Sequence, residues 1–303
     1  MIGQNSDAVD ASQVTRVSAI IVAFHTPAQD IECIVKTLHS LPSSEFLVDV
    51  VIVQNDDGPP LRVAGAALVH GHGNIGFGAG VRLGIESTDS EYIFLLNPDC
   101  ALSSGDSQRI LEQVTSGVPR AIYGPVVRDA DGKVAYHSYA DWTYTPGRYW
   151  SRFKARRYFD HPSDSQLPAA MKLPGTAVIM KRELAVELGP FDPAFFLYGE
   201  DRDLTRRARQ IDIPIYIIQD AAVIHRGGAS GVTVPDIVTA GQATAALEIA
   251  FRRFGALGTY LAAIDLIATS LKPKGSRVRS VRWRVIVDRL HRSGHQAKSG
   301  ATS

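Results

Sequence analysis

Three carboxylates stand within four positions in the C-terminal half of the chain, at Glu200, Asp201 and Asp203. They directly follow an aromatic-rich segment, residues 191–198. Acids at this density are poor core material, because burying unpaired carboxylates costs free energy. Carboxylates suit proton abstraction and the binding of a hard cation. The cluster therefore predicts a catalytic site, although an acidic helix start that interacts with the helix dipole has the same composition.

Two further residues that could do chemistry come at the ends of apolar segments. Asp99 follows one such run within Asn97-Pro98-Asp99, and His225 follows another. A carboxylate oxygen and an imidazole nitrogen can share a metal ion. Taken singly, Asn-Pro-Asp also suits a turn, and a lone histidine is often structural. Together, Asp99, Asp201 and His225 predict a metal-assisted transfer site with Mg²⁺ or Mn²⁺ as cofactor.

The surrounding pattern predicts an α/β protein. Short β-branched apolar runs indicate buried strands at 17–24, 48–53, 66–70 and 92–96. Helical spacing follows the first and third of these runs, and such alternation is typical of a mostly parallel central sheet. Ligands on these sheets lie at the carboxyl ends of the strands. The loops expected to form the site are 24–27, 54–58, 71–80 and 97–100.

The pattern weakens between residues 101 and 172, where the aromatic, turn-rich segment 141–150 predicts a mobile substrate loop. Further strands are expected at 176–180, 214–218 and 221–224. Further helices are expected at 182–188, 201–209, 235–254 and 256–271. We expect a disordered arm at 1–16, a catalytic domain at 17–233, and C-terminal helices with a basic tail at 234–303.

Charge is unevenly distributed in a chain of 303 residues with a formal net charge of +1. Segment 272–298 holds nine basic residues and one acid, which suits a solvated terminus, an anionic lipid surface or nucleic acid. Two cysteines without metal-type spacing predict no disulfide framework and a cytoplasmic protein. The polar N-terminus lacks an apolar signal segment, and no apolar run is long enough to span a membrane.

One glycine pattern has two explanations. Residues 71–76 match G-x-G-x-x-G between an expected strand and an expected helix, as in dinucleotide-binding sites. The match falls after the third expected strand rather than the first. This pattern is the only sequence feature that suggests an NAD-dependent oxidoreductase. The overlapping segment Asn74-Ile75-Gly76-Phe77-Gly78 matches a different motif, described next, that explains the glycines better.

Six short motifs and a histidine occur in order along residues 18–230. They are Ile21-Val22-Ala23-Phe24, Val53-Gln54-Asn55, Asn74-x-Gly76-Phe77-Gly78, Leu96-Asn97-Pro98-Asp99, Leu173-Pro174-Gly175-Thr176-Ala177, Phe191-Asp192-x-x-Phe195-Phe196-x-Tyr198-x-Glu200-Asp201-x-Asp203-Leu204, and His225. This set resembles the family 2 inverting glycosyltransferases of the GT-A fold, especially the bacterial rhamnosyltransferase-like branch. The resemblance implies a GT-A type nucleotide-sugar-binding fold with a C-terminal helical extension.

The resemblance also implies residue roles. Asp201 would be the general base, and Asp99 would bind the metal with His225 as a further ligand. The nucleotide would lie along Ala23, Phe24, His25, Gln54, Asn55, Asn74, Gly76, Arg82 and Asn97. The acceptor pocket would be shaped by Trp142, Gly175, Thr176, Tyr198 and Glu200.

Two positions depart from the family pattern. Gln54 stands where the family usually has an acid that reads the base, although an amide can also pair with a pyrimidine edge. The family often has an asparagine in the helix after Gly78, where this chain has Val81-Arg82. Arg82 could contact phosphate instead.

The sequence thus predicts a metal-dependent inverting glycosyltransferase that uses a nucleotide-diphosphate sugar. The branch favours dTDP-rhamnose as donor, with UDP-galactofuranose or another UDP-sugar as the alternative. The expected acceptor is a lipid-linked or polysaccharide intermediate of cell-envelope glycans. Trp283 among tail arginines predicts peripheral contact with the inner face of the plasma membrane, and no nucleic acid is expected as a partner. A nucleotidyltransferase and a non-catalytic sugar- or lipid-binding module remain alternatives.

Overall fold

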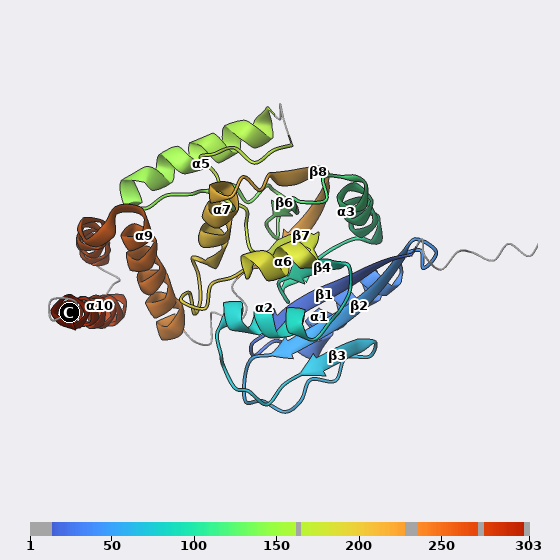
Figure 1. Ribbon diagram of the computed structural model, residues 1–303, viewed down its shortest axis with the longest axis horizontal. Coiled ribbons are helices and arrows are strands. Elements are labelled where there is room, and N and C mark those ends of the chain that lie inside the picture. Colours follow the sequence, from blue (N-terminus) through green and yellow to red (C-terminus); the bar gives the residue numbers. More distant parts are fainter. Residues whose placement is uncertain (1–13, 162–164, 228–234, 272–275, 300–303) are drawn as a thin grey trace, which may run out of the picture.

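The computed structural model describes residues 14–161, 165–227, 235–271 and 276–299. An eight-stranded sheet in the order β3-β2-β1-β4-β7-β6-β8-β5 forms its centre (Figure 1). The strands are β1 Thr15–Ala23, β2 Phe46–Gln54, β3 Ala66–Val69, β4 Tyr92–Leu96, β5 Cys100–Ala101, β6 Ile122–Arg128, β7 Ala177–Lys181 and β8 Ile215–His225. The helices are α1 Ala28–His39, α2 Phe77–Glu86, α3 Ser104–Ser116, α4 Tyr136–Tyr139, α5 Thr145–Asp160, α6 Arg182–Leu188, α7 Glu200–Gln210, α9 Pro235–Ser270 and α10 Ser276–Ser299.

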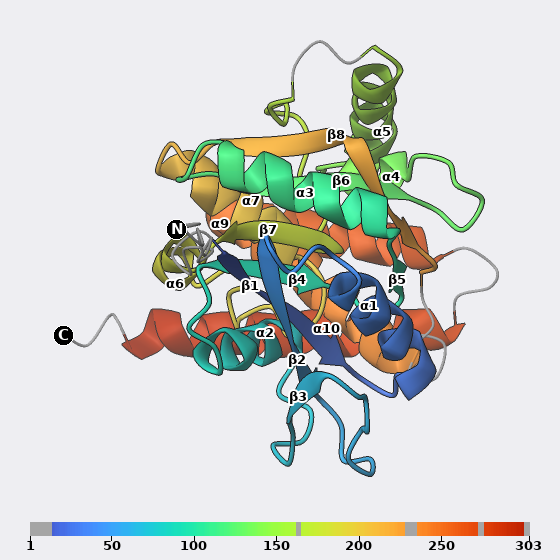
Figure 2. The ribbon, with the colours of Figure 1, turned by 90° about the vertical axis from the view of Figure 1, so that its right-hand side faces the viewer.

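The N-terminal half of the sheet is parallel. β1 pairs with β2 and β4, and β2 pairs with β3, all in parallel. Helices cover both faces of this half, so β4 is buried throughout and β1 is buried from Val17 onward, which explains their uninterrupted apolar sequences. α1 and α3 lie on one face and contact each other, as Figure 2 shows, whereas α2 and α6 lie on the other. The carboxyl ends of β1, β2 and β4 therefore meet at one edge.

The C-terminal half of the sheet brings distant residues to that same edge. β7 pairs antiparallel with β4, and β8 pairs antiparallel with the short strand β5. In the second pairing Cys100 lies opposite His225. Because Cys100 directly follows Asp99, this register places the predicted metal-binding acid beside the predicted histidine.

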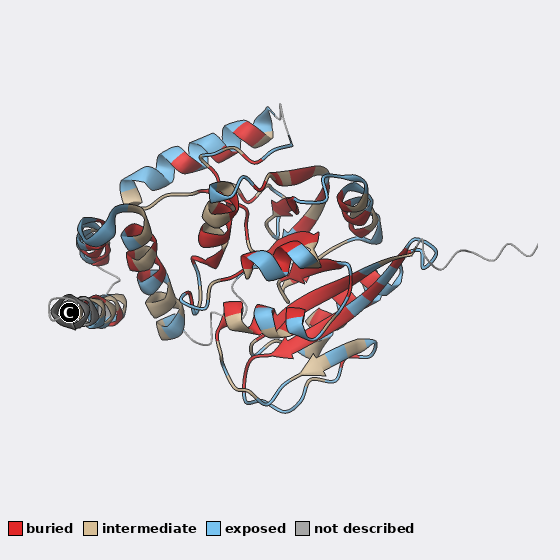
Figure 3. Cartoon of the chain, in the orientation of Figure 1, coloured by how far each residue is buried: buried red, intermediate tan, exposed pale blue. Residues whose placement is uncertain are grey.

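Several expected elements differ from the structure. β1 begins at Thr15, so the expected arm is shorter than 1–16, and residues 1–13 lie outside the described part. The segment expected to be a mobile substrate loop is largely helical, because α5 begins at Thr145. Most of the surface of α5 is exposed (Figure 3), so its sequence contains no clear apolar stripe. The two strands expected near 214–224 are one continuous strand, β8.

The two expected C-terminal helices are confirmed as α9, which breaks at Gly255 with a positive φ of 64°. The basic tail is also helical in its described part, and α10 packs against α9. Val281 and Ile286 are buried, and the guanidinium of Arg282 donates to the hydroxyl of Ser270 (2.9 Å). These residues therefore hold the two helices together, whereas Trp283 is exposed. Lys272 and Lys274 of the tail lie outside the described residues.

A buried ion cluster attaches α9 to α7. Asp203 on α7 is almost fully buried and accepts bonds from Arg206 (2.9 Å), Arg207 (2.6 Å) and Arg252 of α9 (2.8 Å). Arg252 also contacts Asp192 (3.0 Å). Burial alone raises the pKa of Asp203, but the hydrogen bonds and charges of these arginines outweigh it and hold that pKa below its ordinary value. Asp203 is thus a structural member of the acidic cluster.

The Asp203→Asn variant tests this role. It leaves three guanidinium groups around a neutral amide, and breaking a buried ion pair from one side costs about 3 kcal/mol. We expect the free energy of unfolding in urea to fall by about that amount. Asp89→Asn, at an exposed acid paired with Arg16 (3.4 Å), is the matched control and should change stability by less than about 0.5 kcal/mol. Equal effects of the two variants would contradict the role.

Candidate active site

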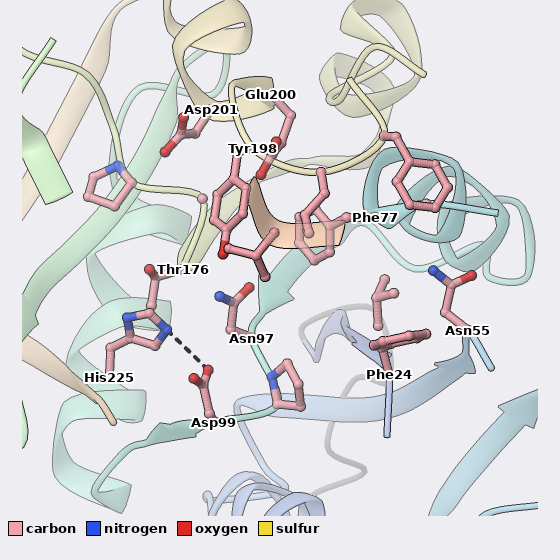
Figure 4. Close-up of a pocket in the computed structure, with 18 of the residues that line it drawn as sticks. Phe24, Asn55, Phe77, Asn97, Asp99, Thr176, Tyr198, Glu200, Asp201 and His225 are labelled. Atoms are coloured by element: carbon pink, nitrogen blue, oxygen red, sulfur yellow. Dashed lines mark ion pairs between the residues drawn. The ribbon is translucent and has the colours of Figure 1, made fainter. Parts of the chain in front are cut away.

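A cavity of about 420 Å³ opens where the strand ends face the start of α7. This volume is within the range of about 300–1,000 Å³ that is usual for small-molecule sites. Most of the residues predicted from the sequence line it (Figure 4): Phe24, Asn55, Asn74, Gly76, Asn97, Asp99, Gly175, Thr176, Tyr198, Glu200, Asp201 and His225. Residues from seven separate stretches of the chain therefore converge on one cavity.

Asp99 and His225 form one wall of the cavity. The Nε2 atom of His225 lies 3.1 Å from Oδ1 of Asp99. The β5–β8 pairing fixes both residues, and the N–H of Arg226 donates to the carbonyl oxygen of Asp99 (3.2 Å). The carboxylate of Asp99 can bind Mg²⁺ or Mn²⁺, and the imidazole of His225 can add a nitrogen ligand to a transition-metal ion.

The residues around this pair fit a divalent cation bound together with a ligand. Oδ1 of Asn97 is buried against the cavity and has no hydrogen-bond partner among the described residues. In the described part of the chain, no cluster of three or more His, Cys, Asp or Glu side chains could hold a metal ion by itself. Two protein ligands leave coordination positions open, as expected where phosphate oxygens and water complete the shell.

The opposite side of the cavity is built by an amide network. Nδ2 of Asn55 donates to Oδ1 of Asn74 (3.2 Å), and the N–H of Ile75 donates to Oδ1 of Asn55 (3.1 Å). This network joins the end of β2 to the start of α2. Gly76 has a φ of 85°, and a Cβ there would lie 2.8 Å from the ring of Phe196. The loop therefore requires glycine at Gly76 on grounds of both conformation and space.

A left-handed turn directs the acids of α7 to the cavity. Tyr198 has a φ of 68° and Gly199 a φ of 90°, and a tyrosine in this region is uncommon and strained. The turn starts α7 at Glu200, so that Glu200 and Asp201 face the cavity while Tyr198 covers them. Figure 4 shows both acids on the side of the cavity away from Phe24 and Asn55.

Glu200 and Asp201 are held in different states. Burial, and next the negative charge of Asp201, raise the pKa of Glu200 to about 8. Its Oε2 atom has no hydrogen-bond partner among the described residues. Asp201 instead forms an ion pair with Lys172 and accepts a bond from the N–H of Arg202 (2.7 Å). At neutral pH Glu200 is therefore mainly protonated, and Asp201 is the ionised acid available to accept a proton.

Gln54, which was predicted to read the base, does not line the cavity. Its side chain is buried, and Nε2 donates to Asp56 (3.0 Å) and to the carbonyl oxygens of Gly58 and Pro59 (both 3.1 Å). Its Oε1 accepts from the N–H of Leu61 (2.9 Å). The amide thus holds the loop that follows β2.

Four other predicted residues do not line the cavity. Ala23 is buried, and its carbonyl oxygen accepts from the N–H of Asn55 (2.7 Å), while His25 donates its N–H to Asp56 (2.7 Å). Arg82 is exposed on α2. Trp142 packs against Arg202 of α7, whose guanidinium carbon lies 4.8 Å from the centre of the Trp142 ring.

The sequence reasoning missed several residues that line the cavity: Lys172, His137, Ser138, Leu197, Ile237 and Val238. Lys172 directly precedes the motif that begins at Leu173, so its position was a usable signal. His137 belongs to the short helix α4, and Ile237 to the first turn of α9. Nothing in their local sequence indicates that they reach the cavity.

No protein-family model matches the chain. The chain is 23% identical over 249 residues to N-acetylglucosaminyl-diphospho-decaprenol L-rhamnosyltransferase of Mycobacterium tuberculosis, from the strains CDC 1551 / Oshkosh and ATCC 25618 / H37Rv. The match covers 72% of this chain and 79% of each relative. Among solved structures, GalNAc-T7 with UDP, GalNAc and Mn²⁺ has a similar fold, with a TM-score of 0.55 and 14% identity. That similarity covers 72% of this chain but only 45% of the other.

This chain is a glycosyltransferase of the GT-A fold. The sequence match supports the class, and the structural similarity shows the fold. The predicted fold and enzyme class are thereby confirmed. In the glycosyltransferase, only part of the G-x-G-x-x-G pattern reaches the cavity: Asn74 and Gly76 line it, and Gly71 and Gly73 do not.

The raised pKa of Glu200 predicts how the free energy of unfolding depends on pH. The folded state holds a proton on Glu200 that the unfolded state releases, so this residue contributes a destabilisation that grows as pH rises from 4.5 to about 8. Glu200→Gln mimics the protonated form. We expect it to raise the free energy of unfolding by about 1–3 kcal/mol at about pH 9 and by much less at about pH 5.

Urea unfolding at the two pH values measures the effect. Glu45→Gln, at an exposed glutamate, is the control and should show no pH-dependent gain. A gain for Glu200→Gln that is the same at both pH values would contradict the assignment.

Proposed function

We propose that the enzyme is a metal-dependent inverting glycosyltransferase that transfers a sugar from a nucleotide-diphosphate donor to a lipid-linked or polysaccharide acceptor of the cell envelope. One observation carries the proposal: an ionised Asp201 and the Asp99–His225 pair face the same cavity from different sides. Asp201 as the base and Asp99–His225 as the site for the leaving group would then lie on separate walls. This arrangement suits a direct displacement at the sugar carbon between them. Rhamnose from dTDP-rhamnose is the proposed sugar, because the mycobacterial relatives carry that activity in their name.

The reaction follows from this placement. A carboxylate oxygen of Asp201 accepts the proton of an acceptor hydroxyl while the hydroxyl oxygen attacks the anomeric carbon. The new glycosidic bond forms as the bond to the diphosphate breaks, and attack from the opposite face inverts the configuration. A divalent cation, when bound by Asp99 and His225, would neutralise the charge of the departing diphosphate. Asn55, Asn74 and the start of α2 would hold the nucleotide.

Neighbouring residues prepare the acceptor side. Lys172 balances the charge of Asp201 and holds its carboxylate against the cavity wall. Protonated Glu200 can donate a hydrogen bond to an acceptor oxygen, since a carboxylic acid carries one O–H donor. Thr176 and Tyr198 line the same region and would position the sugar ring of the acceptor.

The first test is nucleotide release from a panel of dTDP- and UDP-sugars, with membrane extract as the source of acceptor. We expect release from dTDP-rhamnose, and a fall in kcat of about 10²–10⁴-fold in Asp201→Asn, which keeps the shape but removes the base. Asp57→Asn changes an exposed acid outside the cavity and should keep full activity.

The outcomes separate the alternatives. Release of UDP from a UDP-sugar would replace the donor but keep the mechanism. Donor binding without turnover, by calorimetry with every sugar of the panel, would favour a binding module. Undiminished turnover in Asp201→Asn would exclude this residue as the base.

The metal pair is tested separately. Asp99→Asn removes a charged ligand, so we expect the Mn²⁺ concentration for half-maximal activity to rise about tenfold or more. His225→Ala should have the same direction of effect. Asp57→Asn again serves as the control and should leave the metal dependence unchanged. Full activity of the wild-type enzyme after chelation would contradict a metal-dependent reaction.

A further inference from the structure

The second part of α9 has an unusual distribution of side chains. Its inward face is made mainly of small residues, such as Ala262 and Ala263, which pack against the rest of the protein. Its outward face holds large apolar side chains that are exposed: Phe254, Leu257, Tyr260, Leu261, Ile264, Ile267 and Leu271. The only charged residue between Phe254 and Leu271 is Asp265, and its carboxylate accepts bonds from Thr145 (2.9 and 3.1 Å).

This face is too apolar for an ordinary solvated helix. From Leu257 onward, after the break at Gly255, the outward residues recur at three- and four-residue intervals and therefore form one stripe along the helix. Soluble proteins rarely expose continuous apolar surface of this extent unless it contacts a partner. No helix in the described part of the chain is long and apolar enough to cross a membrane. The stripe is therefore suited to lie on an apolar partner.

The flanking helices identify the chemistry of that partner. α5 starts beside α9 (Figure 1). At this point the ring centroids of Tyr144 and Phe254 lie 6.1 Å apart in a stacked arrangement. α5 exposes Tyr149, Trp150 and Phe153, and carries five basic residues against one acid, Asp160. On its other side the stripe is followed by α10, which exposes Arg279, Trp283 and Arg284.

We propose that the outer stripe of α9, with the exposed aromatic and basic side chains of α5 and α10, docks on the surface of an anionic lipid bilayer. Aromatic and aliphatic side chains would enter the boundary between headgroups and acyl chains, and basic side chains would contact lipid phosphates. A second copy of the chain fits less well, because a two-fold contact would bring two basic surfaces together. The inference goes beyond the reaction and does not depend on which sugar is transferred.

The surface differs from the one expected from the sequence. The tail charge is present, but buried Val281 and Ile286 hold α10 to α9 and are unavailable to lipid. The apolar part of the contact comes from α9 instead.

Vesicle sedimentation of the full chain tests the proposal without any sugar donor. The wild-type protein should bind vesicles of phosphatidylcholine mixed with phosphatidylglycerol, more weakly at high salt, and bind pure phosphatidylcholine least. The double variant Leu257→Gln/Ile264→Gln changes side chains that are 69% and 50% exposed, so it should fold normally. We expect its partition to the anionic vesicles to fall about tenfold or more.

A matched variant on another surface controls for the loss of apolar side chains. Leu47→Gln/Val186→Gln changes residues on β2 and α6 that are 47% and 57% exposed, and it should bind as the wild type does. Equal losses in both variants, or no binding by the wild type, would overturn the proposal. A wild-type dimer that Leu257→Gln/Ile264→Gln dissociates in the ultracentrifuge, without vesicle binding, would assign the stripe to a second copy instead.

Activity separates this proposal from the proposed function. With a water-soluble acceptor analogue, nucleotide release by Leu257→Gln/Ile264→Gln should stay within about twofold of wild type, since the stripe lies outside the cavity. Vesicle binding that persists in Asp201→Asn, where turnover is lost, would show that docking is independent of catalysis. Loss of docking in Asp201→Asn would contradict a separate surface.

Discussion

The cost of taking three carboxylates out of water governs the structure around the start of α7. Each acid is accommodated by different means. Asp203 is surrounded by arginines, one of which belongs to α9. Asp201 is paired with Lys172, and Glu200 holds its proton because burial raises its pKa to about 8. The same cluster therefore attaches the C-terminal helices, leaves one ionised acid at the cavity and keeps its neighbour neutral.

Hydrogen bonds joined by short stretches of backbone connect Asp201 to the segment that carries Asp99. The hydroxyl of Thr205 donates to the carbonyl oxygen of Asp201 (2.8 Å) and accepts from the N–H of Leu173 (3.0 Å). Three residues later, the carbonyl oxygen of Thr176 accepts from the N–H of Asn97 (2.9 Å). Segment 172–176 is thus tied at one end to α7 and at the other to the end of β4. The two walls of the cavity are fixed relative to each other, as catalytic positioning requires.

The sequence revealed those parts of the fold and the site where local pattern and tertiary position coincide. Buried parallel strands need continuous apolar runs, so the strand ends, and with them Asn55, Asn97 and Asp99, could be located. The place of Gln54 in its motif does not reveal that its amide holds the loop after β2. Lys172 lies 29 positions before Asp201, and only the folded chain shows that they pair. α5 was not predicted as a helix, because a helix that is mostly exposed does not need an apolar stripe in its sequence.

In the C-terminal helices, too, the sequence reveals some features of the surface and not others. A run of basic residues is visible in any sequence, so the charge of the tail pointed to an anionic surface. The sequence does not show which apolar residues are exposed, because large ones such as Leu257 and Ile264 usually lie in the core. A helix that turns its small residues inward and its large ones outward has the same residue spacing as a helix packed the other way. Because the charge lies on helices that flank this apolar face, the two signals describe one surface. Such a surface would let a glycosyltransferase whose described part has no membrane-spanning helix reach an acceptor carried on a lipid.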